Sequence, residues 1–146
     1  MPVTAQDLPS FFLMVGKMAS TTSVMPHTVL IVEDESTSRR ALAMLLGSCG
    51  YLTSAVGSAE EAVSLMRRGV IPEIALVDLD LPGMNGLELI SMIEKLDPSV
   101  RPVLVTGADT DRLEAALRDR HIEHLRKPLE FNRLLALLNS QSHSHN

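Results

Sequence analysis

Acidic, hydroxyl and basic side chains follow short apolar runs at four places in this sequence. The acidic pair Glu33 and Asp34 comes directly after the first run, and Asp78 comes directly after the third. Thr106 closes the fourth run, and Lys127 stands just beyond the fifth. Continuous apolar runs are typical of parallel strands buried on both faces, and the carboxyl ends of such strands meet at one edge of a sheet. We therefore expect these five side chains to lie close together.

A cluster of this composition favours metal binding and phosphoryl transfer. Crowded carboxylates repel one another, so such a group usually signals a bound cation, and ligands that are all oxygens suit Mg²⁺. Transfer of a phosphoryl group to an aspartate needs a cation and a lysine to neutralise the phosphoryl oxygens, and a carboxylate as the nucleophile. Asp78 is the natural acceptor, because the turn at residues 81–86 would hold it at an open strand end.

The elements that must position these residues follow from the alternation of two patterns after residue 27. Short apolar or β-branched runs predict strands at residues 28–32, 52–56, 74–77, 103–105 and 122–125. Amphipathic stretches predict helices at residues 36–48, 58–68, 86–96, 109–118 and 129–139. Ser36 and Ser58 are candidate N-caps, Glu61 completes a capping box with Ser58, and Gly69 can end its helix. Five strands alternating with five helices predict a three-layer α/β sandwich with a parallel sheet.

The composition fits one domain of 146 residues with an aliphatic core and a net charge of −5. This charge, with three Phe, one Tyr and no Trp, argues against nucleic acid or a membrane as a partner. The single cysteine, Cys49, favours a reducing cytoplasm and is expected to be buried. No stretch approaches the roughly 18 apolar residues of a spanning helix. Four arginines are expected on solvated helix faces: Arg39, Arg40, Arg67 and Arg68.

Four segments together resemble the receiver domain of two-component response regulators. They are residues 30–34 (LIVED), 77–86 (VDLDLPGMNG), 105–107 (VTG) and 126–128 (RKP). The motifs occur in the family's order, and the resemblance covers residues 28–140. It implies a flavodoxin-like, doubly wound, five-stranded parallel sheet of order 2-1-3-4-5 with five helices. It also implies a signalling domain rather than an enzyme, with weak self-dephosphorylation at most.

The resemblance assigns the ligands of Mg²⁺, the implied cofactor. Asp34 matches the acidic residue that contacts the ion directly, and Glu33, where Asp is commoner, matches its partner. Asp78 and the backbone carbonyl of Asp80 complete the implied set of protein ligands.

The resemblance also assigns the residues that handle the phosphoryl group. Asp78 matches the phosphoacceptor, Thr106 the switch hydroxyl that turns toward the phosphoryl group, and Lys127 the lysine that pairs with it. The bond between Lys127 and Pro128 is cis in the family. His124 stands where the family usually has Tyr or Phe, so its switching could be weaker or sensitive to pH.

In function, the resemblance implies a receiver that takes a phosphoryl group from a sensor histidine kinase or a histidine phosphotransfer protein. Its output would be contact with a downstream protein through the face formed by the fourth helix, fifth strand and fifth helix. Two alternatives remain. One is a pseudo-receiver that binds partners without phosphorylation. The other, less favoured, is a haloacid-dehalogenase-type phosphatase, because residues 78–80 match its paired aspartates but follow the third strand rather than the first.

Two segments lie outside the expected domain at residues 28–140. In residues 1–27, apolar side chains recur at helical spacing, so this extension is expected to be either disordered or a short amphipathic helix; the side chains are Leu8, Phe11, Phe12, Val15 and Met18. Residues 141–146 are expected to form a flexible tail.

Overall fold

The computed structural model describes residues 27–107 and 111–140. Its sheet is parallel and five-stranded, and the order β2-β1-β3-β4-β5 confirms the predicted topology. The strands are β1 (Thr28–Val32), β2 (Leu52–Val56), β3 (Ile74–Asp78), β4 (Arg101–Thr106) and β5 (Glu123–Arg126). The amphipathic helix expected before residue 27, and the tail after residue 140, lie outside the described residues.

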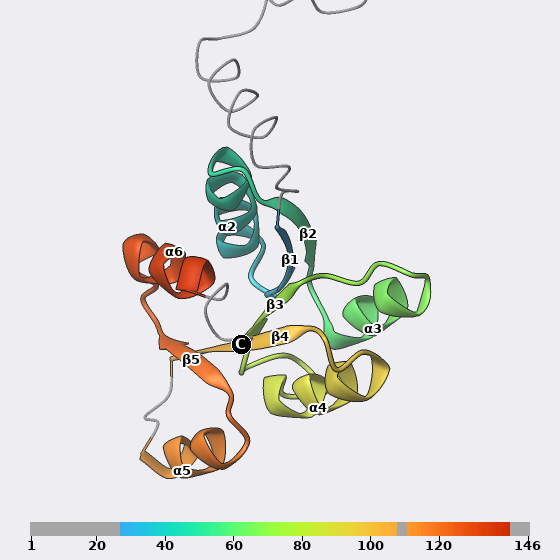
Figure 1. Ribbon diagram of the computed structural model, residues 1–146, viewed down its shortest axis with the longest axis vertical. Coiled ribbons are helices and arrows are strands. Elements are labelled where there is room, and N and C mark those ends of the chain that lie inside the picture. Colours follow the sequence, from blue (N-terminus) through green and yellow to red (C-terminus); the bar gives the residue numbers. More distant parts are fainter. Residues whose placement is uncertain (1–26, 108–110, 141–146) are drawn as a thin grey trace, which may run out of the picture.

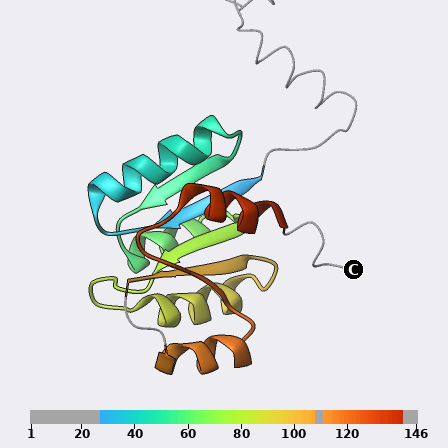
Figure 2. The same cartoon turned by 90° about the vertical axis from the view of Figure 1, so that its left-hand side faces the viewer.

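Five helices cover the two faces of this sheet and complete the predicted three layers (Figure 1). They are α2 (Ser36–Ser48), α3 (Ala59–Arg67), α4 (Gly86–Leu96), α5 (Asp111–Asp119) and α6 (Phe131–Asn139). The helices α2 and α6 lie on one face, and α3, α4 and α5 lie on the other, as the view in Figure 2 also shows. The expected flavodoxin-like fold is confirmed.

Each face of the sheet has its own aliphatic core because successive side chains of a strand point to opposite faces. In β1, Leu30 and Val32 pack toward α3 and α4, whereas Val29 and Ile31 pack toward α2 and α6. The central strand β3 is buried at all five positions, as its continuous apolar run predicts. The two cores hold the strand ends in place, and with them the polar residues that follow.

The caps of two helices differ in how well the sequence predicts them. Glu35, not Ser36, caps α2, and its carboxylate accepts hydrogen bonds from the backbone N–H groups of residues 37 and 38. A carboxylate is the better acceptor at the positive end of a helix. At α3 the predicted cap is confirmed, since the N–H of Glu61 donates to Ser58 Oγ at 3.2 Å. The Glu61 carboxylate accepts from the N–H of Gly57 at 2.9 Å.

The boundaries near the C-terminus shift by one or two residues from those predicted. Ile122, predicted to begin β5, instead donates its N–H to the carbonyl of Leu117 and closes α5. His121 supplies the left-handed turn at this point, with φ of 55°. The helix α5 is described from residue 111 onward, so its predicted start at residue 109 lies outside the described residues, whereas α6 begins at residue 131 rather than 129.

The prediction that Cys49 is buried is wrong, because its side chain is exposed. Cys49 is the C-cap of α2, and its N–H donates to carbonyls of the last helical turn. A turn that ends a helix lies at the surface, and this position outweighs the usual preference of cysteine for the interior.

Within residues 27–107 and 111–140, the helices are all too short or too polar to cross a membrane.

Candidate functional site

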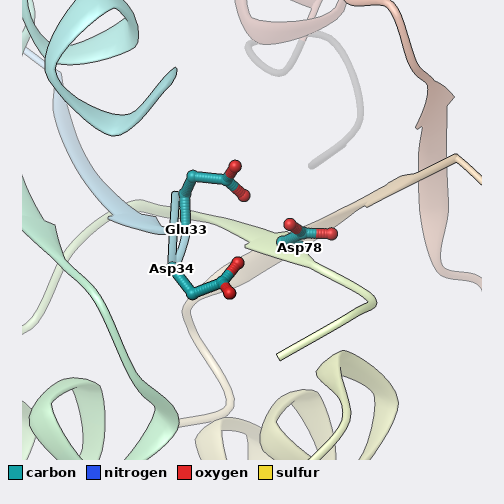
Figure 3. Close-up of side chains that lie close together, drawn as sticks. All are labelled: Glu33, Asp34 and Asp78. Atoms are coloured by element: carbon teal, nitrogen blue, oxygen red, sulfur yellow. The ribbon is translucent and has the colours of Figure 1, made fainter. Parts of the chain in front are cut away.

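Three carboxyl groups converge at the carboxyl edge of the sheet (Figure 3). Glu33 and Asp34 follow β1, Asp78 ends β3, and one oxygen from each lies within 4.8 Å of the others. Glu33 and Asp78 are buried, whereas Asp34 is exposed. The structure therefore brings together the three acidic side chains that the sequence singled out.

The pairing of β1 with β3 explains why these carboxyl groups meet. Val32 and Val77 are partners in the parallel register, so the residues that follow them leave the sheet side by side. The N–H of Glu33 also donates to the carbonyl of Val56 at 3.1 Å, which continues the line of β1 beyond its last paired residue. Backbone hydrogen bonds, rather than side-chain contacts alone, thus place the first acidic residue.

Lys127 reaches the same cluster from the loop after β5. Its Nζ lies 2.9 Å from Asp78 Oδ2 and 3.7 Å from Glu33 Oε2. The N–H of Lys127 donates to the carbonyl of Thr106 at 2.8 Å, which anchors the base of the side chain at the end of β4. The peptide bond between Lys127 and Pro128 is cis, as in the family that the sequence resembles.

Thr106 and Asp80 flank Asp78. Thr106 is fully buried at the end of β4, directly after Val105, which is the register partner of Asp78. The N–H of Asp80 donates to Asp78 Oδ1 at 3.1 Å, so the backbone after β3 turns back over the carboxylate. Asp78 is therefore held through both of its oxygens, by Asp80 on one and by Lys127 on the other.

The two buried acids of the site, Glu33 and Asp78, have pKa values shifted in opposite directions. Burial first, then the hydrogen bond with Asp78 and the negative charge of Asp78, together raise the pKa of Glu33 to about 8. Burial also raises the pKa of Asp78, but hydrogen bonds with Glu33, Lys127 and the Asp80 N–H outweigh it and leave this pKa below its usual value. The pKa of Lys127 is raised, because its hydrogen bond to Asp78 and the surrounding negative charges outweigh the effect of burial.

These residues fit a hard divalent cation. The donor atoms are carboxylate oxygens, the ligand type that Mg²⁺ and Ca²⁺ prefer. Three carboxyl groups lie around the single ammonium of Lys127, so the fully ionised cluster carries more negative charge than Lys127 balances. A cation bound among the three carboxyl groups would relieve that excess.

Arg39 has a role at this site that the prediction of a solvated helix face missed. Its Nη1 donates to the carbonyl of Glu33 at 2.9 Å and lies 3.4 Å from the carbonyl of Asp34. Gly57 leaves room for this side chain, because a Cβ at residue 57 would lie 2.9 Å from Arg39 Nη1. The available signal was its place in the first turn of α2, next to the acidic pair.

His124 lies apart from the acidic cluster. It is half-buried on β5, where its register partner is Leu104. Arg126, two residues further along β5, is the register partner of Thr106. A switching role for His124 remains a prediction.

A cavity of about 600 Å³ opens beside the site, between α2 and the loop that leads into α6. Glu33, Asp78 and Lys127 line one end, and the remainder is mostly aliphatic. The Asp78 carboxylate thus borders a space that an incoming group can enter.

Comparisons with known proteins agree with this geometry. Residues 29–139 match the family model described as the response regulator receiver domain. A response regulatory protein of Vibrio cholerae is 32% identical over 111 residues, which are 73% of this chain and 45% of that protein. The two-component response regulator PhoP of Pseudomonas aeruginosa is 36% identical over 116 residues, 77% of this chain and 50% of that protein. The chain thus spans half or less of the length of these two relatives.

Among solved structures, a response regulator receiver domain protein (CheY-like) from Methanospirillum hungatei superimposes with a TM-score of 0.74. The alignment covers 80% of this chain and 94% of that one, at 24% identity. The likeness concerns the fold.

Proposed function

From the premise that this chain belongs to the response regulator receiver domain family of two-component signalling, we propose that it accepts a phosphoryl group on Asp78. The proposal rests on the polar groups that surround the Asp78 carboxylate. Its two oxygens face Lys127 Nζ at 2.9 Å and the Asp80 N–H at 3.1 Å, with two further carboxyl groups beside it. Structural ion pairs alone do not require three acids around one lysine at an open strand end.

The transfer step follows from this arrangement. An oxygen of Asp78 attacks the phosphorus of a phosphohistidine on a sensor kinase or a histidine phosphotransfer protein. The new O–P bond forms as the P–N bond breaks, and the imidazole leaves with the electron pair and takes up a proton from water. The product on this chain is an aspartyl phosphate. Lys127, already beside Asp78, pairs with a phosphoryl oxygen, and the Thr106 hydroxyl turns toward the same group.

We propose that Mg²⁺ is held by Glu33, Asp34, Asp78 and the backbone carbonyl of Asp80. When bound, the ion supplies positive charge that offsets the charge of the phosphoryl oxygens. Arg39 keeps the carbonyls of Glu33 and Asp34 in place and so holds the acidic pair against the incoming group.

The downstream output would be protein contact through α5, β5 and α6. Thr106 lies on the strand next to β5, and its register partner is Arg126. A movement of Thr106 toward a phosphoryl group would therefore reach β5 first, and His124 with it. Some relatives carry enzyme names, such as a cyclic di-GMP phosphodiesterase of Thermotoga maritima, but this chain spans 28% of that protein. We expect slow self-dephosphorylation as the only turnover of the receiver.

Labelling with a small phosphodonor tests the proposal directly. The full chain, incubated with Mg²⁺ and acetyl phosphate, should gain the mass of one phosphoryl group, and Asp78→Asn should gain none. Asp80→Asn is the matched control, because it changes an exposed carboxylate two residues away and keeps the backbone carbonyl. This control should still be labelled. Equal labelling of wild type and Asp78→Asn would refute the assignment.

A Mg²⁺ titration separates a receiver from a pseudo-receiver. A receiver should bind the ion saturably, and Asp34→Asn should weaken the binding by at least about tenfold, as loss of a charged ligand does. A chain that is neither labelled nor binds Mg²⁺ would be a phosphorylation-independent interaction module.

A further inference from the structure

The helix α3 forms a ridge between two hollows of the surface, and it lies next to α4 on one face of the sheet (Figure 1). One hollow, of about 380 Å³, lies between α3 and α4 and is lined by Met84 and Met92. The other, of about 390 Å³, lies on the opposite side of α3. Glu60, Ser64 and Arg68 border both hollows and are spaced four residues apart, so they form one exposed stripe. We call this stripe the α3 ridge.

The charges of the α3 ridge are separated along the helix. Glu60 lies in the first turn of α3, and the adjacent Arg67 and Arg68 lie at its end. Within residues 27–107 and 111–140, the side chains of these three residues form no hydrogen bond or ion pair. The neighbouring Glu61 differs, because its carboxylate accepts from the N–H of Gly57 and so helps to cap the helix. One end of the ridge is therefore acidic, the other is basic, and both remain available to another molecule.

A second copy of this ridge is complementary to the first. A two-fold axis through Ser64 makes the two copies of α3 antiparallel, and an isologous contact pairs each residue with its counterpart across the axis. Glu60 and Arg68 are each four residues from Ser64, so Glu60 of either copy faces Arg68 of the other. Each ridge also meets a hollow lined by Met84 and Met92, whose side chains adapt readily to a new neighbour.

We infer that the α3 ridge is the contact surface of a symmetric homodimer in which the two α3 helices pack antiparallel. The charge pattern favours a second copy over a uniformly acidic or basic protein, because each end of the ridge attracts the opposite end. The contact is small and has charges at its rim, so it is weak and sensitive to salt. Since α3 follows β2, and β5 forms the opposite edge of the sheet, the dimer leaves β5 accessible.

Charge exchange in the full chain tests this orientation. Glu60→Lys, and separately the double variant Arg67→Glu, Arg68→Glu, place like charges opposite one another in the dimer. Each change should weaken dimerisation at least tenfold. An equimolar mixture of the two variants restores opposite charges at both contacts and should dimerise within about threefold of wild type. Sedimentation velocity measures the dissociation constants over protein concentrations from about 10 μM to 1 mM.

Two controls make the same charge changes on helices of the opposite face of the sheet. They are Glu130→Lys at the start of α6 and the double variant Arg40→Glu, Arg133→Glu on α2 and α6, all at exposed positions. Both controls should dimerise as wild type does. If circular dichroism shows that a reversed variant is unfolded, Glu60→Gln and Arg68→Gln replace the reversals, and each should weaken dimerisation about threefold.

Disulfide formation at the axis gives a second measurement. In a Cys49→Ser background, Ser64→Cys places two copies of one residue against each other, and a disulfide requires Cα atoms within about 7 Å. With a mild oxidant, this variant should form a covalent dimer at least tenfold faster than Ser48→Cys, which is exposed on α2.

Three outcomes would overturn the inference. They are a wild-type chain that stays monomeric up to about 1 mM, a dimer that persists unchanged in both reversed variants, and a mixture of folded variants that fails to restore dimerisation. Equal disulfide rates at residues 64 and 48 would likewise contradict the position of the axis. Because none of these measurements involves Asp78, the proposed phosphoryl transfer is tested separately.

Discussion

At the scale of single residues, Glu33 and Asp78 are chemically alike but differ in protonation. Lys127 lies 2.9 Å from Asp78 and 3.7 Å from Glu33, so its positive charge stabilises the ionised form of Asp78 more strongly than that of Glu33. The Asp80 N–H also stabilises the ionised form of Asp78. Glu33 lacks such a donor among the described hydrogen bonds and retains its proton until about pH 8. Asp78 is therefore ionised near neutral pH, as the proposed role of nucleophile requires.

The raised pKa of Glu33 predicts how stability depends on pH without Mg²⁺. A folded pKa of about 8 lies above the ordinary value of 4.5, so the folded chain holds the proton more tightly than the unfolded chain. This contribution to stability is complete below pH 4.5 and is lost as pH rises through about 8. Between these values, wild type should lose up to about 1.4 kcal/mol per pH unit relative to Glu33→Gln.

Urea unfolding of both proteins from pH 5 to 8, with a chelator present, measures this difference. Glu60→Gln on the exposed side of α3 serves as the control and should follow wild type. Saturating Mg²⁺ should remove most of the slope, because a bound cation favours the ionised carboxylate. A wild-type profile parallel to that of Glu33→Gln would contradict the assignment of this proton.

At the scale of elements, the start of α4 packs closely against the end of β3 that carries Asp78. Gly86, the first residue of α4, packs directly on the backbone after β3, and its N–H donates to the carbonyl of Leu79 at 2.8 Å. A Cβ at residue 86 would lie 2.4 Å from the carbonyl oxygen of Asp78 and 2.8 Å from Leu79 Cα. Such contacts are with backbone atoms, so a side chain at this position must push the helix away from the strand.

Gly86→Ala should therefore damage both stability and the site. We expect a loss of about 2 kcal/mol in the free energy of unfolding, typical of overpacking, and slower labelling of Asp78. Gly47→Ala in α2 is the control, because nothing lies within 4 Å of a Cβ there. It should raise the free energy of unfolding by about 0.5 to 1 kcal/mol through helix propensity. Denaturant unfolding and the labelling rate check both; a harmless Gly86→Ala would contradict the close packing.

At the scale of the whole molecule, Arg101 joins β4 to β5 and α6. Its guanidinium donates to both carboxylate oxygens of Glu123 on β5, at 2.6 and 2.7 Å. It also donates to the carbonyl of Leu137 at 2.9 Å and to that of Leu138 at 3.4 Å, near the end of α6. One side chain on β4 thus holds both an edge strand and the helix that covers it.

Removing this side chain should cost more than removing its charged partner. Arg101→Met leaves the Glu123 carboxylate and two helix carbonyls without their donor, and we expect a loss of about 3 kcal/mol in the free energy of unfolding. Glu123→Gln keeps an acceptor and leaves the carbonyl contacts intact, so about 1 kcal/mol is expected. Chemical denaturation measures the free energy of unfolding of both variants and of wild type. Equal losses would mean that the contacts with α6 contribute nothing.

Much of this architecture was predictable because local patterns and global packing agree. The buried run of β3 and the strand boundaries at residues 28–32 and 52–56 were predicted correctly, since apolar β-branched runs have few other stable environments. The gathering of Glu33, Asp34 and Asp78 followed from the rule that parallel strands end at one edge. Functional side chains that follow buried parallel strands can therefore be predicted from a sequence.

Other features depend on contacts between distant segments, and local patterns do not show them. The cap of α2 was predicted at Ser36 but belongs to Glu35, because the geometry of the turn decides which side chain reaches the free N–H groups. Arg39 was expected in solvent, yet the position of Gly57 on a neighbouring loop leaves room for it beside the acidic pair. Cys49 was expected in the core, but it ends a helix at the surface.

The sequence by itself determined the class of fold, the order of the elements and the identity of the acidic cluster, because hydrophobic periodicity and residue type are local properties. Only the tertiary structure decided which oxygen of Asp78 faces Lys127, which of the two buried acids keeps its proton, and which side chains line the cavity beside the site. Those properties arise from distances and burial between residues far apart in the chain, and they exist only once the two faces of the sheet have been covered.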